Sequence, residues 1–352
     1  MNFVFPSVEL VDEKDNFKRI EKAARVCYQS DDKISEDSAF PFFQRMVKRG
    51  HTSTLEHSVV FVRTHTPEAC MKLKEILSSY EEDTGYPHYI RHSLWDENDT
   101  NLYFPVDKEF EGEEFPLGRC VGSEYLFSGN IRAWRKICEK YPGESILYDT
   151  FFDHPAFNDI FSKYHEELYG LRRKFDPVYK KEDIEIVDSI PDDFYDADKH
   201  NIITLKIIGD RGVIDEFARH RSCGISIEST RYCSYTDSGV TFVFPWWYEK
   251  LHDDPKYATA AGDFGNRCYD TEAAYQDWMN KFKVPQMARG NLTLWVKSQG
   301  AFTATVQQWR DILKLRDSAA AHPDAQRIAK MIEKVLVEKA GIEDIWGVKN
   351  NE

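Results

Sequence analysis

The sequence lacks the features that mark membrane, secreted and zinc-binding proteins. No stretch approaches the roughly 18 consecutive apolar residues of a membrane-spanning helix, and the first residues, MNFVFPSVELVDEKDN, contain no basic segment followed by a long apolar run. Seven cysteines are widely scattered, and no C-x-x-C pair suggests zinc or a redox-active dithiol. These absences predict a soluble, cytoplasmic protein with reduced thiols.

Several motifs that identify nucleotide, metal or acyl-transfer sites are also missing. No two glycines are separated by one residue, so the G-x-G-x-x-G fingerprint is absent, as is the phosphate loop G-x-x-x-x-G-K-[ST]. The chain also lacks H-E-x-x-H, the G-x-S-x-G nucleophile turn and the zinc deaminase pattern. We therefore expect no metal site, and any nucleotide is held by a different arrangement.

The charge balance is acidic. The 352 residues include 46 Lys and Arg against 60 Asp and Glu, a formal net charge of −14. Phosphate backbones and anionic lipids require clustered cations, so we expect neither a nucleic-acid partner nor a membrane partner. A hydrophobic fraction of 41% is nevertheless ample for a buried core, which predicts a folded globular protein.

Hydrophobic periodicity and capping residues divide the chain into helices and strands. Thr66-Pro67-Glu68 is typical of a helix start, and the run from Val59 to Val62 favours a strand. The mixture predicts an α+β fold, with mixed α/β elements and no Rossmann fingerprint. Strands are expected at 59–62, 202–208 and 240–244, and helices at 40–48, 67–80, 124–141, 156–174, 213–220, 271–282, 303–315 and 323–339.

Two polar regions interrupt this pattern. Residues 81–122 are rich in turn-forming residues and contain an acidic cluster at 109–114, and residues 180–199 are acid-rich and loop-like. We predict a single domain over residues 1–352 with insertions at about 81–122 and 140–200.

A dense polar cluster lies between Arg219 and Tyr235, where the chain reads RHRSCGISIESTRYCSY. It combines three arginines, a histidine, a glutamate and several hydroxyls. The planar, permanently charged guanidinium suits phosphate, so a nucleotide phosphate is a reasonable ligand. A salt-bridge network between subunits is the alternative that composition leaves open.

Four blocks of sequence resemble the flavin-dependent thymidylate synthases. The first signature is Arg219-His220-Arg221 followed by Ser229 and Arg231-Tyr232, and the phrases D-R-G-V, E-F-x-R-H-R and E-S-T-R-Y-C resemble the longer-chain branch of the family. The other three blocks are Gly50 to His57 (GHTSTLEH), Gln286 to Arg289, and Leu315-Arg316 with Ala321-His322 and Gln326.

The resemblance implies a methyltransferase that converts dUMP to dTMP. Members of this family take the carbon from methylenetetrahydrofolate and use FAD that NADPH has reduced. Their sites lie between the subunits of a homotetramer. The implied partners are therefore the small molecules dUMP, methylenetetrahydrofolate and NADPH, together with three further copies of the chain.

The same resemblance assigns the flavin and nucleotide contacts. Ser229 is read as a binding hydroxyl, because no histidine-carboxylate relay is evident beside it. Arg316 is the implied catalytic residue, because a cation against the uracil stabilises negative charge that develops on the ring. The implied FAD contacts are His51, Ser53, Glu56, Arg219, His220, Arg221, Asp311 and His322, and the implied dUMP contacts are Glu216, Arg219, Ser229, Thr230, Arg231, Arg289 and Arg316.

Structural roles compete with some of these assignments. Glu56 is also suited to pairing within a turn, and His57 and His322 to satisfied structural positions, while Cys233 favours packing. If the nucleotide reading is right, five arginines are expected to cluster in space. They are Arg219, Arg221, Arg231, Arg289 and Arg316.

Five positions depart from the family pattern. Gly224 replaces a usual serine, Ile227 a glutamate or glutamine, Thr305 an asparagine and Gln307 an arginine, and Asp311 stands where another asparagine is usual. These changes leave two alternatives open. One is flavin- and folate-dependent transfer to another pyrimidine nucleotide, and the other is a nucleotide-binding homologue without catalysis.

Overall fold

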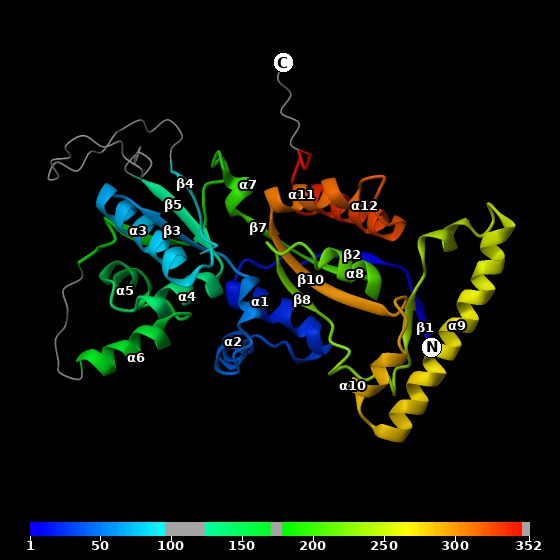
Figure 1. Ribbon diagram of the computed structural model, residues 1–352. Helices are drawn as coiled ribbons and strands as arrows, with labels where there is room; N and C mark the ends of the chain where they lie inside the picture. Colours follow the sequence, from blue (N-terminus) through cyan, green and yellow to red (C-terminus); the bar gives the residue numbers. More distant parts are fainter. Residues whose placement is uncertain (88, 96–123, 170–177, 347–352) are drawn as a thin grey trace, which may run out of the picture. The chain divides into compact units, whose positions relative to one another are not determined.

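The computed structural model describes residues 1–87, 89–95, 124–169 and 178–346. Its contacts divide the chain into two compact units, one formed by residues 1–57 with 201–352 and the other by residues 58–200 (Figure 1). Each unit has its own antiparallel four-stranded sheet.

The sheet of the first unit has the order β2-β7-β10-β8. Its centre is the pairing of β7 (Ile202–Asp210) with β10 (Lys297–Thr305), which runs in register over nine residues of each strand. The edge strands are β2 (Ser7–Leu10) and β8 (Gly224–Ile227). A separate parallel pair joins β1 (Asn2–Val4) to β9 (Thr241–Val243).

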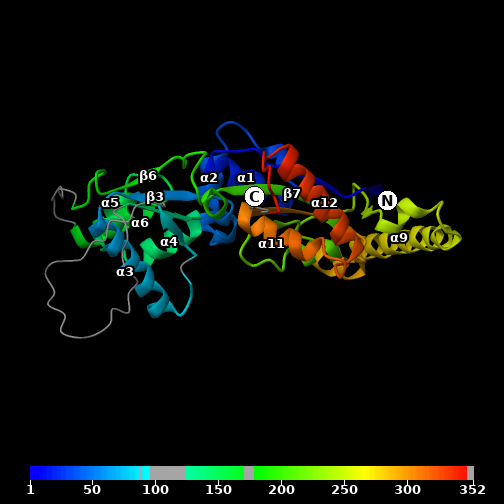
Figure 2. The same cartoon turned by 90° about the horizontal axis from the view of Figure 1, so that it is seen from above.

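Helices cover both faces of this sheet. Phe302 of β10 packs in the core formed by α8 (Arg211–Phe217), α11 (Val306–Arg316) and α12 (Pro323–Glu338). Ala301, the preceding residue, packs against α1, and successive side chains of a strand point to opposite faces. Figure 2 shows α11 and α12 side by side. The other face carries α1 (Asn16–Arg25), η1 (Val26–Tyr28), α2 (Ala39–Lys48) and η3 (Thr52–Glu56).

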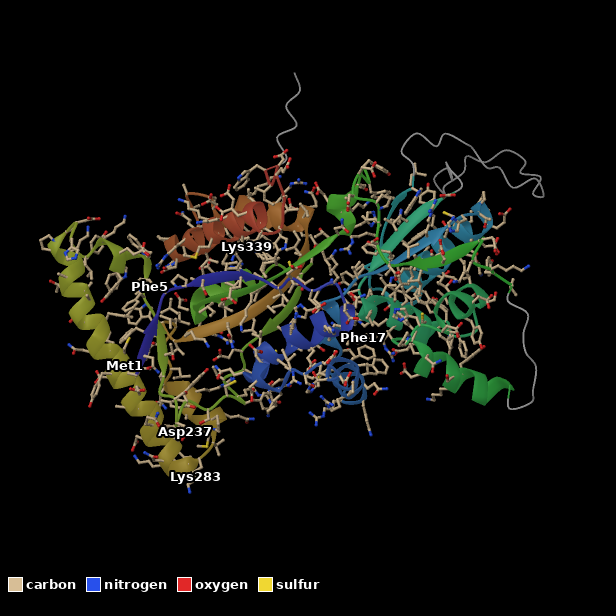
Figure 3. All side chains as sticks on the ribbon, turned by 180° about the vertical axis from the view of Figure 1, so that it is seen from behind. Met1, Phe5, Phe17, Asp237, Lys283 and Lys339 are labelled. Carbon is tan, nitrogen blue, oxygen red and sulfur yellow. The ribbon has the colours of Figure 1, made fainter. Side chains whose placement is uncertain are left out.

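A 28-residue helix, α9 (Pro255–Phe282), packs beside the β1–β9 pair. Its buried residues Phe264, Cys268, Tyr275 and Met279 recur at helical spacing and meet Phe242 of β9 in one cluster. The amino group of Met1 lies 2.8 Å from Glu272 on this helix, so the N-terminus is fixed there (Figure 3). The short elements η2 (Asp31–Lys33), η4 (Trp246–Lys250), α10 (Pro285–Ala288) and η5 (Arg289–Asn291) complete the unit.

The second unit has the strand order β4-β5-β3-β6. Its buried histidine, His200, accepts or donates hydrogen bonds at both ring nitrogens, to Ser128 Oγ (2.7 Å) and Ser93 Oγ (3.0 Å). The strands are β3 (Val60–Thr64), β4 (Arg91–Leu94), β5 (Tyr125–Gly129) and β6 (Ile184–Val187), and the helices are α3 (Pro67–Thr84), α4 (Ile131–Lys140), α5 (Ser145–Phe151), α6 (Asn158–Tyr169) and α7 (Ala197–His200).

The α+β prediction is confirmed, and so are the helices α2, α3 and α12 and the strands β3, β7 and β9. Three predictions are wrong in detail. Residues 125–129 form a strand before α4, residues 184–187 form a strand within the expected loop, and 303–305 end the unpredicted strand β10. Strand β5 is buried along its whole length, so it has no period-two alternation to separate it from a helix.

Other predictions fall partly outside the described residues or stay predictions. Most of the proposed insertion at 81–122 is not described, and neither is the end of the helix expected at 156–174, of which α6 is the described part. The start expected for the helix at 271–282 is wrong, because α9 begins at Pro255. The description of the chain as one domain with insertions stays a prediction.

A second buried histidine, His57, joins three elements of the first unit. Its side chain is fully buried, with Nδ1 2.7 Å from Thr303 Oγ1 on β10 and Nε2 2.9 Å from Ser226 Oγ on β8. Thr303 in turn lies 2.7 Å from Thr204 Oγ1 on β7. Burial, with a smaller contribution from Arg19, lowers the pKa of His57 to about 3. The histidine is therefore a neutral structural bridge, as the structural alternative for it predicted.

This bridge predicts a pH-dependent stability. An unfolded chain binds a proton at His57 below about pH 6.5, whereas the folded chain does not until about pH 3. The free energy of unfolding should thus fall by roughly 1.4 kcal/mol per pH unit as the pH drops through this window. His57→Gln should lower stability overall but remove this part of the slope between pH 6.5 and 5, measured by urea unfolding.

His252→Gln provides the control, because this histidine is exposed. Its slope should equal that of the unmodified protein. Parallel curves for the unmodified protein and His57→Gln would contradict the neutral bridge. His200 supplies a similar slope in both proteins, because burial also lowers its pKa to about 3.

Candidate active site

Arg316, the last residue of α11, is held by Glu216 near the end of α8 and by His220, which follows that helix. The Arg316 side chain is buried, and its Nη1 donates to Glu216 Oε2 at 2.8 Å, while Nη2 donates to the Glu216 carbonyl oxygen at 2.5 Å. Its Nε donates to His220 Nε2 at 3.2 Å. A guanidinium has five N–H groups, so these three contacts leave two for a ligand.

Burial and neighbouring charges shift the pKa values of Arg316 and His220. Burial lowers the pKa of Arg316, while Glu216 raises it and Arg219 lowers it further. Burial also lowers the pKa of His220, and Arg316 and Arg219 act in the same direction. Because the ordinary value is 6.5, His220 is neutral at pH 7.

The start of α11 explains one departure from the family pattern. Thr305 caps the helix: its Oγ1 accepts from the backbone N of Gln308 (3.2 Å), and Gln308 Oε1 accepts from the backbone N of Thr305 (2.9 Å). This reciprocal capping box satisfies two terminal N–H groups. Gln308 also donates to the Ser222 carbonyl oxygen (3.2 Å), which ties α11 to the turn that contains His220.

The segment of His51 to Glu56 packs against β8 from the other face of the sheet. A Cβ added to Gly224 would lie 2.7 Å from the carbonyl oxygen of Glu56. Gly224 therefore allows the backbone of Glu56 to lie closer to β8 than the usual serine would permit. Ile227, at the other end of β8, packs against the hydrophobic core, so it offers no polar side chain there.

The loop after β8 is anchored on η1. The backbone N of Ser229 donates to the Cys27 carbonyl oxygen (3.0 Å), and the ring centroids of Tyr28 and Tyr232 are 5.5 Å apart. Tyr28 Oη also lies 3.5 Å from Nδ1 of His51. The residue before the loop, Glu228, is almost fully buried, with Tyr235 Oη donating to it at 2.6 Å. Its other carboxylate oxygen lies 2.8 Å from Lys297 Nζ.

A family model described as thymidylate synthase complementing protein matches residues 9–73 and 195–340, more than half of the chain. The chain belongs to the flavin-dependent thymidylate synthase family. No curated protein matches it. The unmatched residues 74–194 fall within the second compact unit, so the family blocks all lie in the first unit or at its boundary.

In this thymidylate synthase homologue, one chain brings only some of the predicted residues into contact. Glu216, His220 and Arg316 touch directly, on the face of the sheet that α8 and α11 cover. His51 and Glu56 belong to the segment on the opposite face. Arg219 meets this group through its backbone, whose N donates to the Glu216 carbonyl oxygen at 3.3 Å. The remaining predicted residues are exposed or half-buried, and among the described residues their side chains share no hydrogen bond or ion pair with this group; the same holds for the side chain of Arg219. These residues are Ser53, Arg221, Ser229, Thr230, Arg231, Arg289, Asp311 and His322.

The roles assigned to these residues stay predictions, and so does the clustering of the five arginines. His322 caps α12 by accepting from the backbone N of Asp324 (3.3 Å), and its side chain is 52% exposed. One ring nitrogen of His322 therefore makes a structural contact, while about half of the side chain remains exposed. Arg289 begins η5 and is exposed.

Sequence reasoning missed Tyr28, Lys297 and the structural role of Glu228. No spacing signal marks Tyr28, because its contacts come from residues 23 and 204 positions away. Lys297 lines a polar cavity of about 400 Å³ that contains none of the predicted site residues. Its other lining residues are Gln29, Asp31, Asp32, Tyr235, Ser238, Thr241 and Gln299.

Neither a metal-binding cluster nor a membrane-spanning helix occurs within residues 1–87, 89–95, 124–169 and 178–346. No three His, Cys, Asp or Glu side chains are grouped closely enough there to hold a metal ion. None of the helices in those ranges is both long and apolar enough to cross a membrane.

The close approach at Gly224 predicts that two glycine-to-alanine substitutions change the free energy of unfolding in opposite directions. Gly224→Ala should lower the free energy of unfolding by about 1–3 kcal/mol, because the obstructing atoms are backbone atoms of Glu56. Gly262→Ala, in exposed helix with nothing within 4 Å of the added carbon, should raise it by about 0.5–1 kcal/mol. Urea unfolding of both variants measures the difference, and equal effects would refute it.

Proposed function

We propose that the protein catalyses the reductive methylation of dUMP to dTMP, with methylenetetrahydrofolate as carbon donor and FAD reduced by NADPH. Membership of the family supports this reaction in general. The observation that carries the proposal for this chain is the buried Arg316, which Glu216 and His220 hold with two N–H groups to spare. This arrangement suits a fixed cation that binds a uracil carbonyl.

The cationic residues fit a dinucleotide cofactor. Arg219, Arg221 and Arg231 are exposed, and none of them forms an ion pair among the residues that the structure describes. In a chain with a net charge of −14, such unneutralised arginines concentrate positive potential where phosphates bind. When bound and reduced, FAD supplies the hydride for the methyl group.

The predicted residues would then have three roles: binding the cofactor, binding dUMP and stabilising charge on the uracil ring. Arg219, His220 and Arg221 would hold the cofactor, together with His51, Ser53, Glu56, Asp311 and His322. Ser229, Thr230, Arg231 and Arg289 would hold dUMP. Arg316 would stabilise negative charge as it develops on the uracil ring, because a positioned cation is most effective in a site that excludes water.

A homotetramer is part of this proposal. The segment from His51 to Glu56, which would contact the flavin, and the Arg316 group pack on opposite faces of one sheet, at opposite sides of β8. Residues that act on one pair of ligands are thus spread over a single chain, and sites between subunits would reunite them. A cytoplasmic location stays a prediction.

The second candidate acceptor is another pyrimidine nucleotide. Ile227 stands where the family usually has glutamate or glutamine, and it packs against the core. Ile227 cannot offer the hydrogen bond that a glutamate or glutamine side chain would offer to the ligands. The acceptor could therefore differ from dUMP, and activity with dUMP and with dCMP should be compared. A nucleotide-binding homologue without catalysis is the remaining alternative.

The cofactor and the reaction can be tested together. The purified protein should take up FAD, and anaerobic NADPH should bleach the flavin band, faster with dUMP present than without it. With methylenetetrahydrofolate the products should include dTMP. Failure to bind FAD would favour the non-catalytic alternative, and methylation of dCMP in place of dUMP would favour the second acceptor.

Arg316→Ala should reduce dTMP formation by about 100-fold or more, because it removes the stabilising cation. Flavin absorbance should remain in the variant. Arg310→Ala is the matched control: this arginine of the same helix donates to the carbonyl oxygens of Asp344 and Ile345. Undiminished turnover in Arg316→Ala would remove Arg316 from the mechanism.

A further inference from the structure

His220 makes a contact whose direction fixes its proton. Arg316 Nε carries hydrogen and donates, so His220 Nε2, at 3.2 Å, must accept through its lone pair. In the neutral ring the proton then resides on Nδ1. This tautomer follows from the hydrogen bond rather than from an observed hydrogen.

Protonation of His220 would abolish this contact. An imidazolium donates at both nitrogens and has no lone pair for Arg316. It would also place a third positive charge beside Arg316 and Arg219, the two charges that act on this ring. The only carboxylate of the group, Glu216, is already bound to Arg316. Burial and these charges keep the pKa of His220 below 6.5.

The contact also determines where the guanidinium points. Glu216 binds Nη1 and Nη2, and His220 binds Nε, so the two residues fix the plane of the fork from different edges. Without His220, the fork keeps its contacts to one residue and is free to pivot about them. Small displacements of a catalytic group are costly, because the reaction depends on the position of the charge.

We infer that His220 is a positioning residue for Arg316, and that it holds the catalytic arginine only while its own ring is neutral. This inference rests on the proposed function of Arg316. It predicts that loss of turnover on the acid side of the pH profile begins below pH 6.5, as His220 takes up a proton.

Two substitutions separate this role from contact with the flavin. The amide oxygen of His220→Gln takes the place of Nε2 and accepts from Arg316 at every pH. The amide of His220→Asn takes the place of Nδ1 and does not reach Arg316. The measurement is kcat against pH at saturating FAD, together with the dissociation constant for FAD.

Turnover should distinguish the two variants. His220→Gln should keep kcat within about 10-fold of the unmodified protein at pH 8 and lose the acid limb. His220→Asn should lose about 100-fold or more in kcat at all pH values, a size typical of a displaced catalytic charge. An unchanged acid limb in His220→Gln, or full turnover in His220→Asn, would overturn the inference.

A second measurement does not depend on activity. A double-mutant cycle on the free energy of unfolding, with His220→Asn and Arg316→Lys, should show coupling at pH 8 that disappears toward the lowest pH at which the protein stays folded. If the protein formed no dTMP but the coupling followed this pattern, the proposed function would fail while the contact stood. Coupling that is absent or independent of pH would refute the role of His220.

Discussion

The arrangement of the first unit depends on one buried imidazole. His57 is uncharged and satisfied at both ring nitrogens, by β8 on one side and β10 on the other. It follows directly after η3, so it fixes the segment from His51 to Glu56 against the strand that leads to the Ser229 loop. An unpaired buried polar group costs about 1–3 kcal/mol, and this selects a single register in which both hydroxyls meet the ring.

Much of the fold could be predicted because its helices carry local signals. Thr66 and Pro67 begin α3 as their sequence indicates, and Pro323 begins α12. Strand β10 carried no such signal, because Gly300, Ala301 and Ala304 dilute its hydrophobic pattern although it is central to the sheet. Its identity as a strand comes from β7 and β8 on either side, which no local window includes.

The candidate site, like the fold, could be predicted only in part from the sequence. Motif spacing brought attention to Glu216, His220 and Arg316, but their mutual contacts join residues about 100 positions apart and follow only from the packing of α8 and α11 on one sheet. The departures at Gly224 and Thr305 become intelligible in the structure, since one permits a close backbone approach and the other caps a helix. They change local packing and leave the Arg316 group intact.

The interruption of the first unit has a consequence for how the chain folds during synthesis. Strand β2 pairs with β7, and His57 meets Thr303, so partners in the same sheet emerge from the ribosome about 200 to 250 residues apart. Every described strand of the second unit, residues 58–200, pairs within that unit, which is synthesised before β7 appears. Contacts of such high sequence separation form slowly. The nascent N-terminal segment must therefore wait for its sheet partners while the inserted unit is already able to fold.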